Sequence, residues 1–290
     1  MKSNKLKVKH IKPYLWLLPS FLVFFIFTFY PFLKTIYQSF FLVNAQGEVN
    51  RFVGLENYLY ILTDEKFLIA IKNTIIFTAF TVPTSKVIGF LLALLANKRR
   101  KLSPIYETAF ALPMAMSSSI IAMIFQLLYV YPLGLLNGVF HLNIRWLTDP
   151  KYALMAIGIV QIWLSSGHAF VFMLSAVRSV SNDVLESAQI DGVTGFQKII
   201  KIYLPLTTPT LFYLIVTDLA YSMMMMGLVN VLTQGGPNNS TMTIMQYIYR
   251  QFAGTGNYTN ANPAAVIAFF ITLFCTLLTF IWEKKGVHYQ

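Results

Sequence analysis

Residues 71–101 read IKNTIIFTAFTVPTSKVIGFLLALLANKRRK. Their apolar part, 71–96, exceeds the length of about 20 residues that a helix needs to cross the hydrocarbon core of a bilayer. Four basic residues, 98–101, follow it directly. An apolar helix that ends at a basic cluster is typical of a membrane span. This stretch therefore predicts that the chain crosses a membrane.

The composition extends this interpretation to the whole chain. Of its 290 residues, 56% are hydrophobic and 11% are charged, whereas about 25% are charged in soluble domains. So few charges do not cover the surface of a soluble domain of this size. Residues 1–290 are thus predicted to form a single membrane domain. The single cysteine, Cys275, excludes a disulfide within the chain and a cysteine-based metal cluster.

Six apolar segments approach or exceed the length of a membrane-spanning helix: 14–33, 71–96, 105–129, 152–176, 209–232 and 264–282. The first follows a basic start, as in a signal peptide, but it is too long for one and lacks a small-residue cleavage site. The predicted fold is therefore an all-α, polytopic membrane protein with about six transmembrane helices.

The distribution of charge predicts the orientation of these spans. If the chain alternates sides, fourteen basic residues lie on the side of both termini: Lys2, Lys5, Lys7, Lys9, Lys12, Lys98, Arg99, Arg100, Lys101, Arg178, Lys198, Lys201, Lys284 and Lys285. Five lie opposite: Arg51, Lys66, Arg145, Lys151 and Arg250. Positive charge marks the cytoplasmic side, so the basic N-terminus 1–13 and the tail 283–290 are predicted to be cytoplasmic. This bias explains the net charge of +11 without nucleic acid.

The polar insert 178–205, between the fourth and fifth spans, is predicted to form two short helices outside the membrane. Ser181 or Asp183 can cap the first helix, and Glu186, three residues after Asp183, resembles the second half of a capping box. That helix would run to about Asp191, and Gly192 suits a left-handed C-terminal cap.

The second helix of the insert would start after Thr194, which can cap it. Phe196, Ile199 and Ile200 would then share one face. Pro205 is expected to stop this helix and to push Leu204 toward an extended conformation. Such a hinged pair is either a docking element for a partner or an amphipathic loop on the membrane surface.

The insert resembles the EAA loop of the membrane permeases of ABC importers. The matching positions are Glu186, Ala188, Asp191, Gly192, Phe196, Ile202, Leu204 and Pro205. Three positions depart from the family pattern by small or apolar changes: Ser187, Val193 and Ile199.

Three further motifs resemble the maltose-type carbohydrate branch of these permeases: 52–58 (FVGLENY), 133–137 (LGLLN) and 233–237 (TQGGP). The ending 287–290 (VHYQ) is similar to the glycerol-3-phosphate branch.

This resemblance implies a function and a set of partners. In the family, the EAA loop sits in a cleft of an ATP-binding subunit and couples its movement to the membrane helices. Coupling roles are thereby implied for Glu186, Ser187, Ala188, Asp191, Gly192, Phe196, Leu204 and Pro205. The implied partners are a second homologous permease that forms a heterodimer with this chain, a dimer of ATP-binding subunits that hold ATP and Mg, and an extracellular solute-binding protein. The implied location is the bacterial cytoplasmic (inner) membrane.

The chain has no sequence signature of an enzyme. It lacks the Gly-x-x-x-x-Gly-Lys-Ser/Thr phosphate loop of an ATPase. Its four histidines, His10, His141, His168 and His288, are scattered and form no metal-binding or nucleophile motif. We therefore expect a transport subunit that binds no cofactor or metal of its own.

Polar residues inside the predicted spans are candidates for the solute pathway, because ionisable groups in a membrane usually face a cavity or a partner. The candidates are Asp218, Tyr221, Asn230 and His168, together with Met225 from the soft, adaptable run of methionines at 223–226. Lys86 also interrupts the second span. Carboxylate, amide and aromatic groups suit a polyhydroxylated solute. The alternative for Asp218 is hydrogen bonding between helices, and for the methionines it is packing against lipid or in the core. An ionised Asp218 would disfavour an anionic solute.

The resulting hypothesis is the permease of an ABC importer for a sugar or oligosaccharide. An importer of glycerol-3-phosphate or a related polyol phosphate is the nearest alternative. An autonomous secondary transporter or channel remains a second alternative, although the sequence has no clear inverted repeat and few paired charges inside the spans. A membrane-bound enzyme would need a catalytic cluster, and the sequence offers none.

Overall fold

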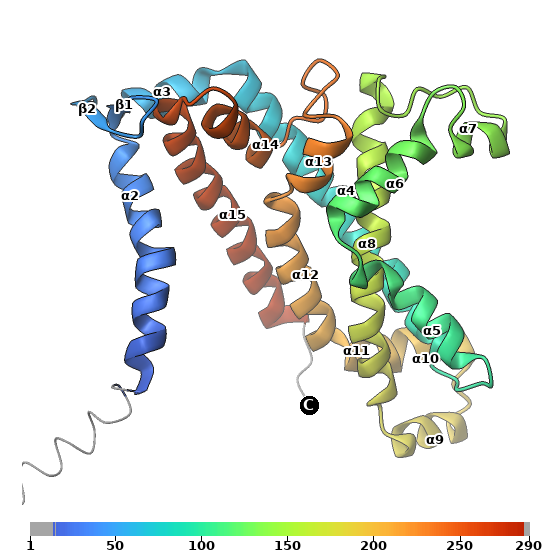
Figure 1. Cartoon of the computed structure of the whole chain (residues 1–290). Helices are drawn as coiled ribbons and strands as arrows, with labels where there is room; N and C mark the ends of the chain where they lie inside the picture. Colours follow the sequence, from blue (N-terminus) through green and yellow to red (C-terminus); the bar gives the residue numbers. More distant parts are fainter. Residues whose placement is uncertain (1–13, 15, 287–290) are drawn as a thin grey trace, which may run out of the picture. The chain divides into compact units, whose positions relative to one another are not determined.

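The computed structural model describes Tyr14 and residues 16–286 (Figure 1). The predictions for the N-terminus 1–13 and the ending 287–290 concern residues outside the described part. The chain packs as two compact units, one of Met1–Thr63 with Ile248–Ile267 and the other of Asp64–Tyr247 with Ala268–Gln290. Each unit is described by itself.

The described residues contain four helices that are long and apolar enough to cross a membrane: Trp16–Gln38, Glu65–Ala96, Pro150–Arg178 and Tyr258–Ile281. They correspond to the predicted first, second, fourth and sixth spans. Two bent pairs of helices raise the number to as many as six. The prediction of an all-α membrane protein with about six spans is therefore confirmed.

The first unit joins helical segments to a small hairpin. It contains η1 (Phe25–Phe29), α2 (Tyr30–Gln38), α3 (Glu56–Thr63), η4 (Arg250–Gly254) and the start of α15 (Tyr258–Gly286). Strands β1 (Phe41–Val43) and β2 (Val49–Phe52) pair antiparallel, with Phe41 opposite Phe52. The side-chain amide of Asn57 donates hydrogen bonds to the carbonyls of Ser39 (3.0 Å) and Phe41 (2.9 Å). The asparagine of the 52–58 motif thus holds the start of the hairpin.

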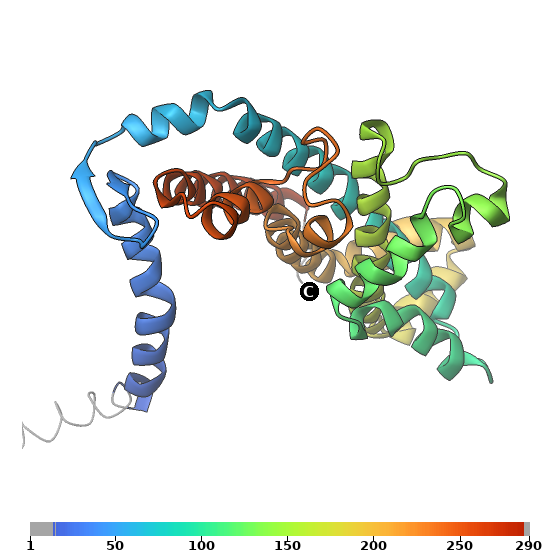
Figure 2. The same cartoon turned by 45° about the horizontal axis from the view of Figure 1, so that its top comes forward.

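The second unit is built around two long helices, α4 (Glu65–Ala96) and α8 (Pro150–Arg178) (Figures 1 and 2). A Cβ on Gly89 of α4 would lie 2.5 Å from the Cβ of Ala169 on α8, so glycine lets the two backbones approach closely. Asp64 and Asp149 cap these helices, each side chain accepting a hydrogen bond from the backbone N–H two residues later (2.8 and 2.9 Å).

The predicted third span, 105–129, is not one helix. It consists of α5 (Ser103–Ala111), η2 (Leu112–Ala115) and α6 (Ser118–Tyr129), bent by 103° (Figure 2). The break follows Pro113, whose ring and missing N–H weaken the helix. Met116 and Ser117 are extended, with ψ of 142° and 136°. The predicted third span is therefore a helix pair broken after Pro113 and not one straight helix.

The predicted fifth span, 209–232, ends early. Helix α12 (Thr208–Met223) stops before a short break, and α13 (Gly227–Leu232) follows. The short helix α7 (Leu135–Phe140) also lies in this unit, and so does α14 (Ile244–Tyr249) up to Tyr247. Helices α9 (Asn182–Ile190) and α10 (Gly195–Lys198) belong to the insert. Figure 1 shows α9 and α10 at one end of α8 and α7 at the other.

Candidate functional site

The insert after α8 folds as two helical segments hinged at Gly192, as predicted. The first is α9, and Ser181 occupies its N-cap position with extended backbone. The predicted alternative, in which Asp183 and Glu186 form a capping box, was wrong, because Asp183 lies inside the first turn.

Gly192 ends α9 in the manner that the sequence predicted. Its φ is +70°, a left-handed conformation that side chains with a Cβ rarely adopt. The N–H of Val193 donates to the carbonyl of Ala188 (3.0 Å), and the N–H of Gly192 donates to that of Gln189 (3.2 Å). These two bonds form a Schellman motif. The direction of the chain after α9 is thereby fixed by one glycine.

The second segment begins with a reciprocal cap. Thr194 and Gln197 form a capping box, and the Gln197 side chain accepts from the Thr194 N–H at 3.1 Å. Helix α10 continues through the π-helical turn η3 (Ile199–Tyr203) into α11 (Leu204–Leu206). Pro205 does not stop this helix, and Leu204 is helical with φ of −61° and ψ of −50°.

The actual bend lies at Thr207, where the chain turns by 66° into α12. Pro205 lies inside the continuous helical segment, directly after the π-helical turn η3. The predicted stop at Pro205 was therefore wrong by two residues.

The predicted coupling residues fall on two faces of this element. Ala188 is buried, together with Ile202 and Tyr203, in a core formed with the ends of α4 and α8. The side-chain amide of Asn97 donates a hydrogen bond to the Tyr203 hydroxyl (3.1 Å). Leu204 and Pro205 are half-buried. This face anchors the element to the helices of the second unit.

The other face is exposed. It carries Glu186, Ser187, Asp191, Gly192 and Phe196. Phe196 is 72% exposed and Ile190, which the sequence reasoning did not single out, is 88% exposed. The sequence could have indicated Ile190, because it is an apolar residue at the end of the predicted helix, directly before Asp191 and Gly192. Two exposed apolar side chains beside carboxylates form a surface suited to a partner rather than to water.

A polar cluster lies in the middle of the second unit. The Lys86 ammonium of α4 forms a buried ion pair with Asp218 Oδ2 of α12. The other carboxylate oxygen, Oδ1, lies 3.7 Å from Nδ1 of His168 on α8. Three helices thus meet at one carboxylate. The sequence flagged Lys86 as an interruption of its span but did not include it in the predicted pathway.

This cluster borders a cavity of about 360 Å³. Three predicted pathway residues line it: His168, Asp218 and Tyr221. Gln161 lines it as well, and its side-chain Oε1 is buried with no hydrogen-bond partner in the described part of the chain. Its amide donates to the Ser165 hydroxyl (2.8 Å), which also lines the cavity. Hydroxyls and a carboxylate therefore line one space, and such groups can exchange hydrogen bonds with hydroxyls.

The remaining two predicted pathway residues lie elsewhere. Met225 is buried in an apolar core with Leu228 and Val229. The Asn230 side chain accepts a hydrogen bond from the Gln246 amide at 3.1 Å. The structure brings neither residue to the cavity. Met225 matches the alternative left open for the methionines, packing in the core, while the Asn230 bond joins α13 to α14.

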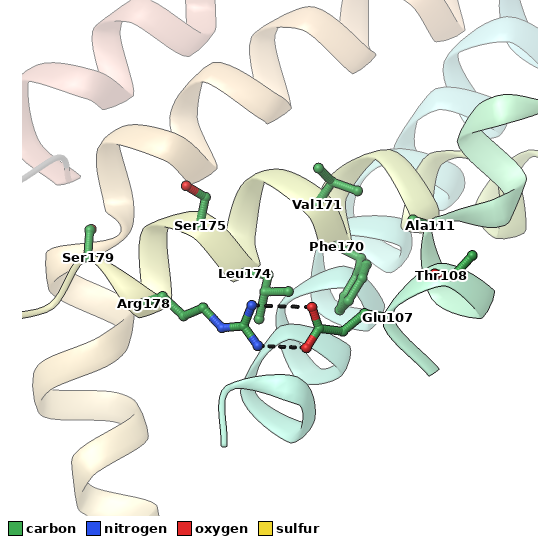
Figure 3. A pocket seen from close by; sticks show the side chains of 9 residues that line it. All are labelled: Glu107, Thr108, Ala111, Phe170, Val171, Leu174, Ser175, Arg178 and Ser179. Carbon is green, nitrogen blue, oxygen red and sulfur yellow. Dashed lines mark hydrogen bonds and ion pairs between the residues drawn. The ribbon is translucent and has the colours of Figure 1, made fainter. Parts of the chain in front are cut away.

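A second pocket, of about 610 Å³, lies between α5 and the last turns of α8 (Figure 3). Glu107 and Arg178 face each other across it. The Arg178 guanidinium donates two parallel bonds to the Glu107 carboxylate, at 2.7 and 3.2 Å. It also donates to the Ala96 carbonyl at 3.0 Å. One residue at the start of the insert thereby joins α4, α5 and α8.

Comparison with known proteins identifies the family of this chain. Residues 85–284 match the family described as "Binding-protein-dependent transport system inner membrane component". The chain belongs to that family. It is a permease subunit of an ABC importer, a multi-pass protein of the inner membrane, and permeases of this family are not themselves enzymes.

Relatives and solved structures are similar to this permease along nearly its whole length. The sn-glycerol-3-phosphate transport system permease protein of Agrobacterium fabrum is 29% identical and aligns over 96% of this chain and 97% of its own. That of Yersinia pestis is 28% identical, covering 96% of both chains. A bacterial alginate ABC transporter in complex with an alginate pentasaccharide-bound periplasmic protein is similar with a TM-score of 0.83, 25% identity and 96% coverage of both chains.

The geometry also changes one electrostatic inference about this permease. The sequence suggested that an ionised Asp218 would disfavour an anionic solute. In the structure Lys86 lies against Asp218, so the pair carries no net charge. His168, beside the same carboxylate, adds a positive charge whenever it is protonated. The cluster therefore does not select against anions.

Proposed function

We propose that this permease forms half of the translocation pathway for a sugar or oligosaccharide. The solute would be delivered by an extracellular binding protein, and ATP hydrolysis on a partner subunit would drive its passage. ATP and Mg would be held by a dimer of ATP-binding subunits, and this chain would bind no cofactor. A second homologous permease would supply the other half of the pathway in a heterodimer.

The observation that carries the proposal is the two-faced insert. Its inner face is anchored in the core by Ala188, Ile202 and Tyr203. Its outer face exposes Ile190 and Phe196 with carboxylates alongside. A rigid element with a solvent-exposed apolar face is suited to dock into a groove of a partner. Because it is continuous with α8 and α12, a displacement of the docked face would move both helices.

The orientation follows from the charge distribution. The insert and the basic cluster 98–101 would lie on the same side as both termini, and positive charge favours the cytoplasmic side. The insert would then lie on the side where ATP-binding subunits act.

The cavity beside Asp218 supports a polyhydroxylated solute. Gln161, Ser165 and Tyr221 offer hydrogen-bonding groups to it, and the paired Lys86 and Asp218 add no net charge. The similarity to the alginate transporter agrees with a carbohydrate. Glycerol-3-phosphate or a related polyol phosphate is the second candidate, supported by the two relatives named as permeases for that solute.

Copurification tests the coupling role. The tagged chain is extracted gently from its native membrane, and we expect an ATP-binding protein and a second six-span permease to come with it. Glu186→Arg reverses the charge of the exposed face and should release the ATP-binding protein, while Glu186→Gln, the matched control, should retain most of it. Equal membrane insertion of both variants is the internal check. Retention of the ATP-binding protein by Glu186→Arg would contradict the proposal.

Uptake by the copurified complex tests the solute class. The complex and its binding protein are placed in vesicles with ATP, and labelled oligosaccharides and glycerol-3-phosphate are supplied separately. Uptake of an oligosaccharide, unaffected by excess glycerol-3-phosphate, is the expected result. Uptake of glycerol-3-phosphate alone would replace the first candidate with the second.

A further inference from the structure

The pocket between α5 and α8 lies next to the polar cavity along the same helix. The polar cavity uses α8 from Gln161 to His168, and the pocket uses it from Phe170 to Ser179. The two spaces do not share a residue of α8, and together they occupy its length from the middle to its end. At about 1.5 Å of rise per residue, the pocket covers the last 15 Å or so of the helix.

Both walls continue from one space to the other. On α8, His168 of the polar cavity is followed by Val171, Ser175 and Ser179 of the pocket. These spacings of three and four place the side chains on one face of the helix. On the facing wall, Thr108 and Ala111 of the pocket are followed by Met114 of the cavity, again at a spacing of three.

We propose that this pocket is the cytoplasmic leg of the solute pathway, through which the solute leaves the polar cavity; the inference rests on the proposed function. The hydroxyls of Thr108, Ser175 and Ser179 line the leg and can exchange hydrogen bonds with a passing sugar. Val171, which is 37% exposed, offers an apolar surface to the ring. This lining holds a solute weakly, as release requires.

The ion pair at the pocket fits an exit rather than an anion-binding site. The Arg178 guanidinium is already engaged by both oxygens of Glu107 and by the Ala96 carbonyl. Its charge is thereby compensated, and it attracts no anion strongly. The pair sits where α8 enters the insert, so movement of the insert would change the width of the pocket at this end.

Cysteine labelling of the whole importer in inside-out vesicles tests the proposal. Cys275 is the only cysteine, so Cys275→Ser gives a background whose ATP-driven uptake is measured first. If the Cys275→Ser importer takes up no solute, either the proposed function is wrong or the serine itself impairs transport. This result is obtained before any cysteine is placed in the pocket. Val171→Cys and Ser175→Cys are then introduced singly. The control is Leu91→Cys on α4, at a side chain that is 50% exposed and lines neither space.

A small methyl thiosulfonate and a bulky charged one are applied from the cytoplasmic face. The bulky charged reagent should react at positions 171 and 175 and abolish uptake while ATP hydrolysis continues. The small reagent should not reduce uptake, because its methylthio group is too small to block the pocket. The control should neither react with the charged reagent nor lose uptake.

Two results would overturn the assignment. Reaction with an apolar maleimide but not with the charged reagent would show that the pocket faces lipid. Full reaction of both positions with the bulky reagent, without loss of uptake, would make it a recess outside the pathway.

Discussion

Two ion pairs lie along α8, one beside its middle between α4 and α12 and one at its last turn, and the two pairs differ in their access to water. The side chains of Lys86 and Asp218 are 3% and 10% exposed, whereas those of Arg178 and Glu107 are 26% and 24% exposed. A charge buried in a medium of low dielectric constant is costly to leave alone, so the inner pair must stay together. The outer pair can exchange its partner for water at little cost.

This difference assigns different tasks to the two regions. The inner pair ties α4 to α12 and fixes one oxygen of Asp218, while the other oxygen lies beside His168 at the polar cavity. The region is therefore suited to hold a constant set of groups toward a solute. The outer region joins α4, α5 and α8 at the start of the insert, and is suited to open and close with it.

The largest effect is expected from breaking the inner pair. Lys86→Met leaves the buried Asp218 carboxylate without its cation, and the free energy of unfolding should fall by about 3–5 kcal/mol. The folded fraction during titration with a denaturing detergent measures this. Ion-pair removal as a whole is often neutral, so Lys86→Met with Asp218→Leu should recover the stability.

Solute uptake by the same variants shows whether Asp218 contacts the solute, independently of its effect on stability. If Asp218 faces the solute, the double variant should fold and hydrolyse ATP but import no sugar. Unchanged stability of Lys86→Met would show that the inner pair does not hold the helices together.

The hinge of the outer region should give an intermediate effect. Gly192→Ala places a Cβ on a residue with φ of +70°, at a cost of about 1–2 kcal/mol. Nothing else lies near that Cβ, so the strain stays in the hinge. We expect more ATP hydrolysed per solute imported.

Gly195→Ala is the matched control for the hinge. Gly195 also has open space around it, but it is the first residue of α10 and has no positive φ. Alanine there should leave the ratio of hydrolysis to uptake unchanged. Equal ratios in the two variants would mean that the conformation of Gly192 has no part in coupling.

The smallest change in stability is expected at the outer ion pair. Arg178→Lys keeps the charge but loses the two parallel bonds to Glu107, and a partly exposed pair contributes only about 0.2–1 kcal/mol. The same detergent titration should therefore show a much smaller fall in the free energy of unfolding for Arg178→Lys than for Lys86→Met. Exchange of the charges, with Glu107→Arg and Arg178→Glu together, should restore most of it. A shift as large as that at Lys86 would remove the distinction between the two regions.

Features governed by local sequence could be predicted. The four long helices follow from continuous apolar runs, and the two caps of the insert follow from Gly192 and Thr194, whose conformations depend on neighbouring backbone groups. The exposed and buried faces of the insert were not separable, because both Ile202 and Ile190 are apolar, and only packing against α4 and α8 distinguishes them.

Features governed by distant residues could not be predicted. Lys86 and Asp218 are 132 positions apart, and no pattern in either span indicates that they pair. The break after Pro113 was missed because membrane helices often accommodate proline, and neighbouring helices decide whether they bend. The run of methionines at 223–226 suggested a pathway surface, yet Met225 packs in the core. Asn230 satisfies the Gln246 amide instead of lining the cavity.

Reconstitution in liposomes distinguishes an ATP-driven permease from an autonomous transporter. The purified permease is placed in liposomes, first alone with proton or sodium gradients and then as the complete complex with ATP and the binding protein. We expect no uptake by the chain alone and ATP-dependent uptake by the complex, lost with Glu186→Arg. Gradient-driven uptake by the chain alone would contradict this expectation and identify an autonomous transporter.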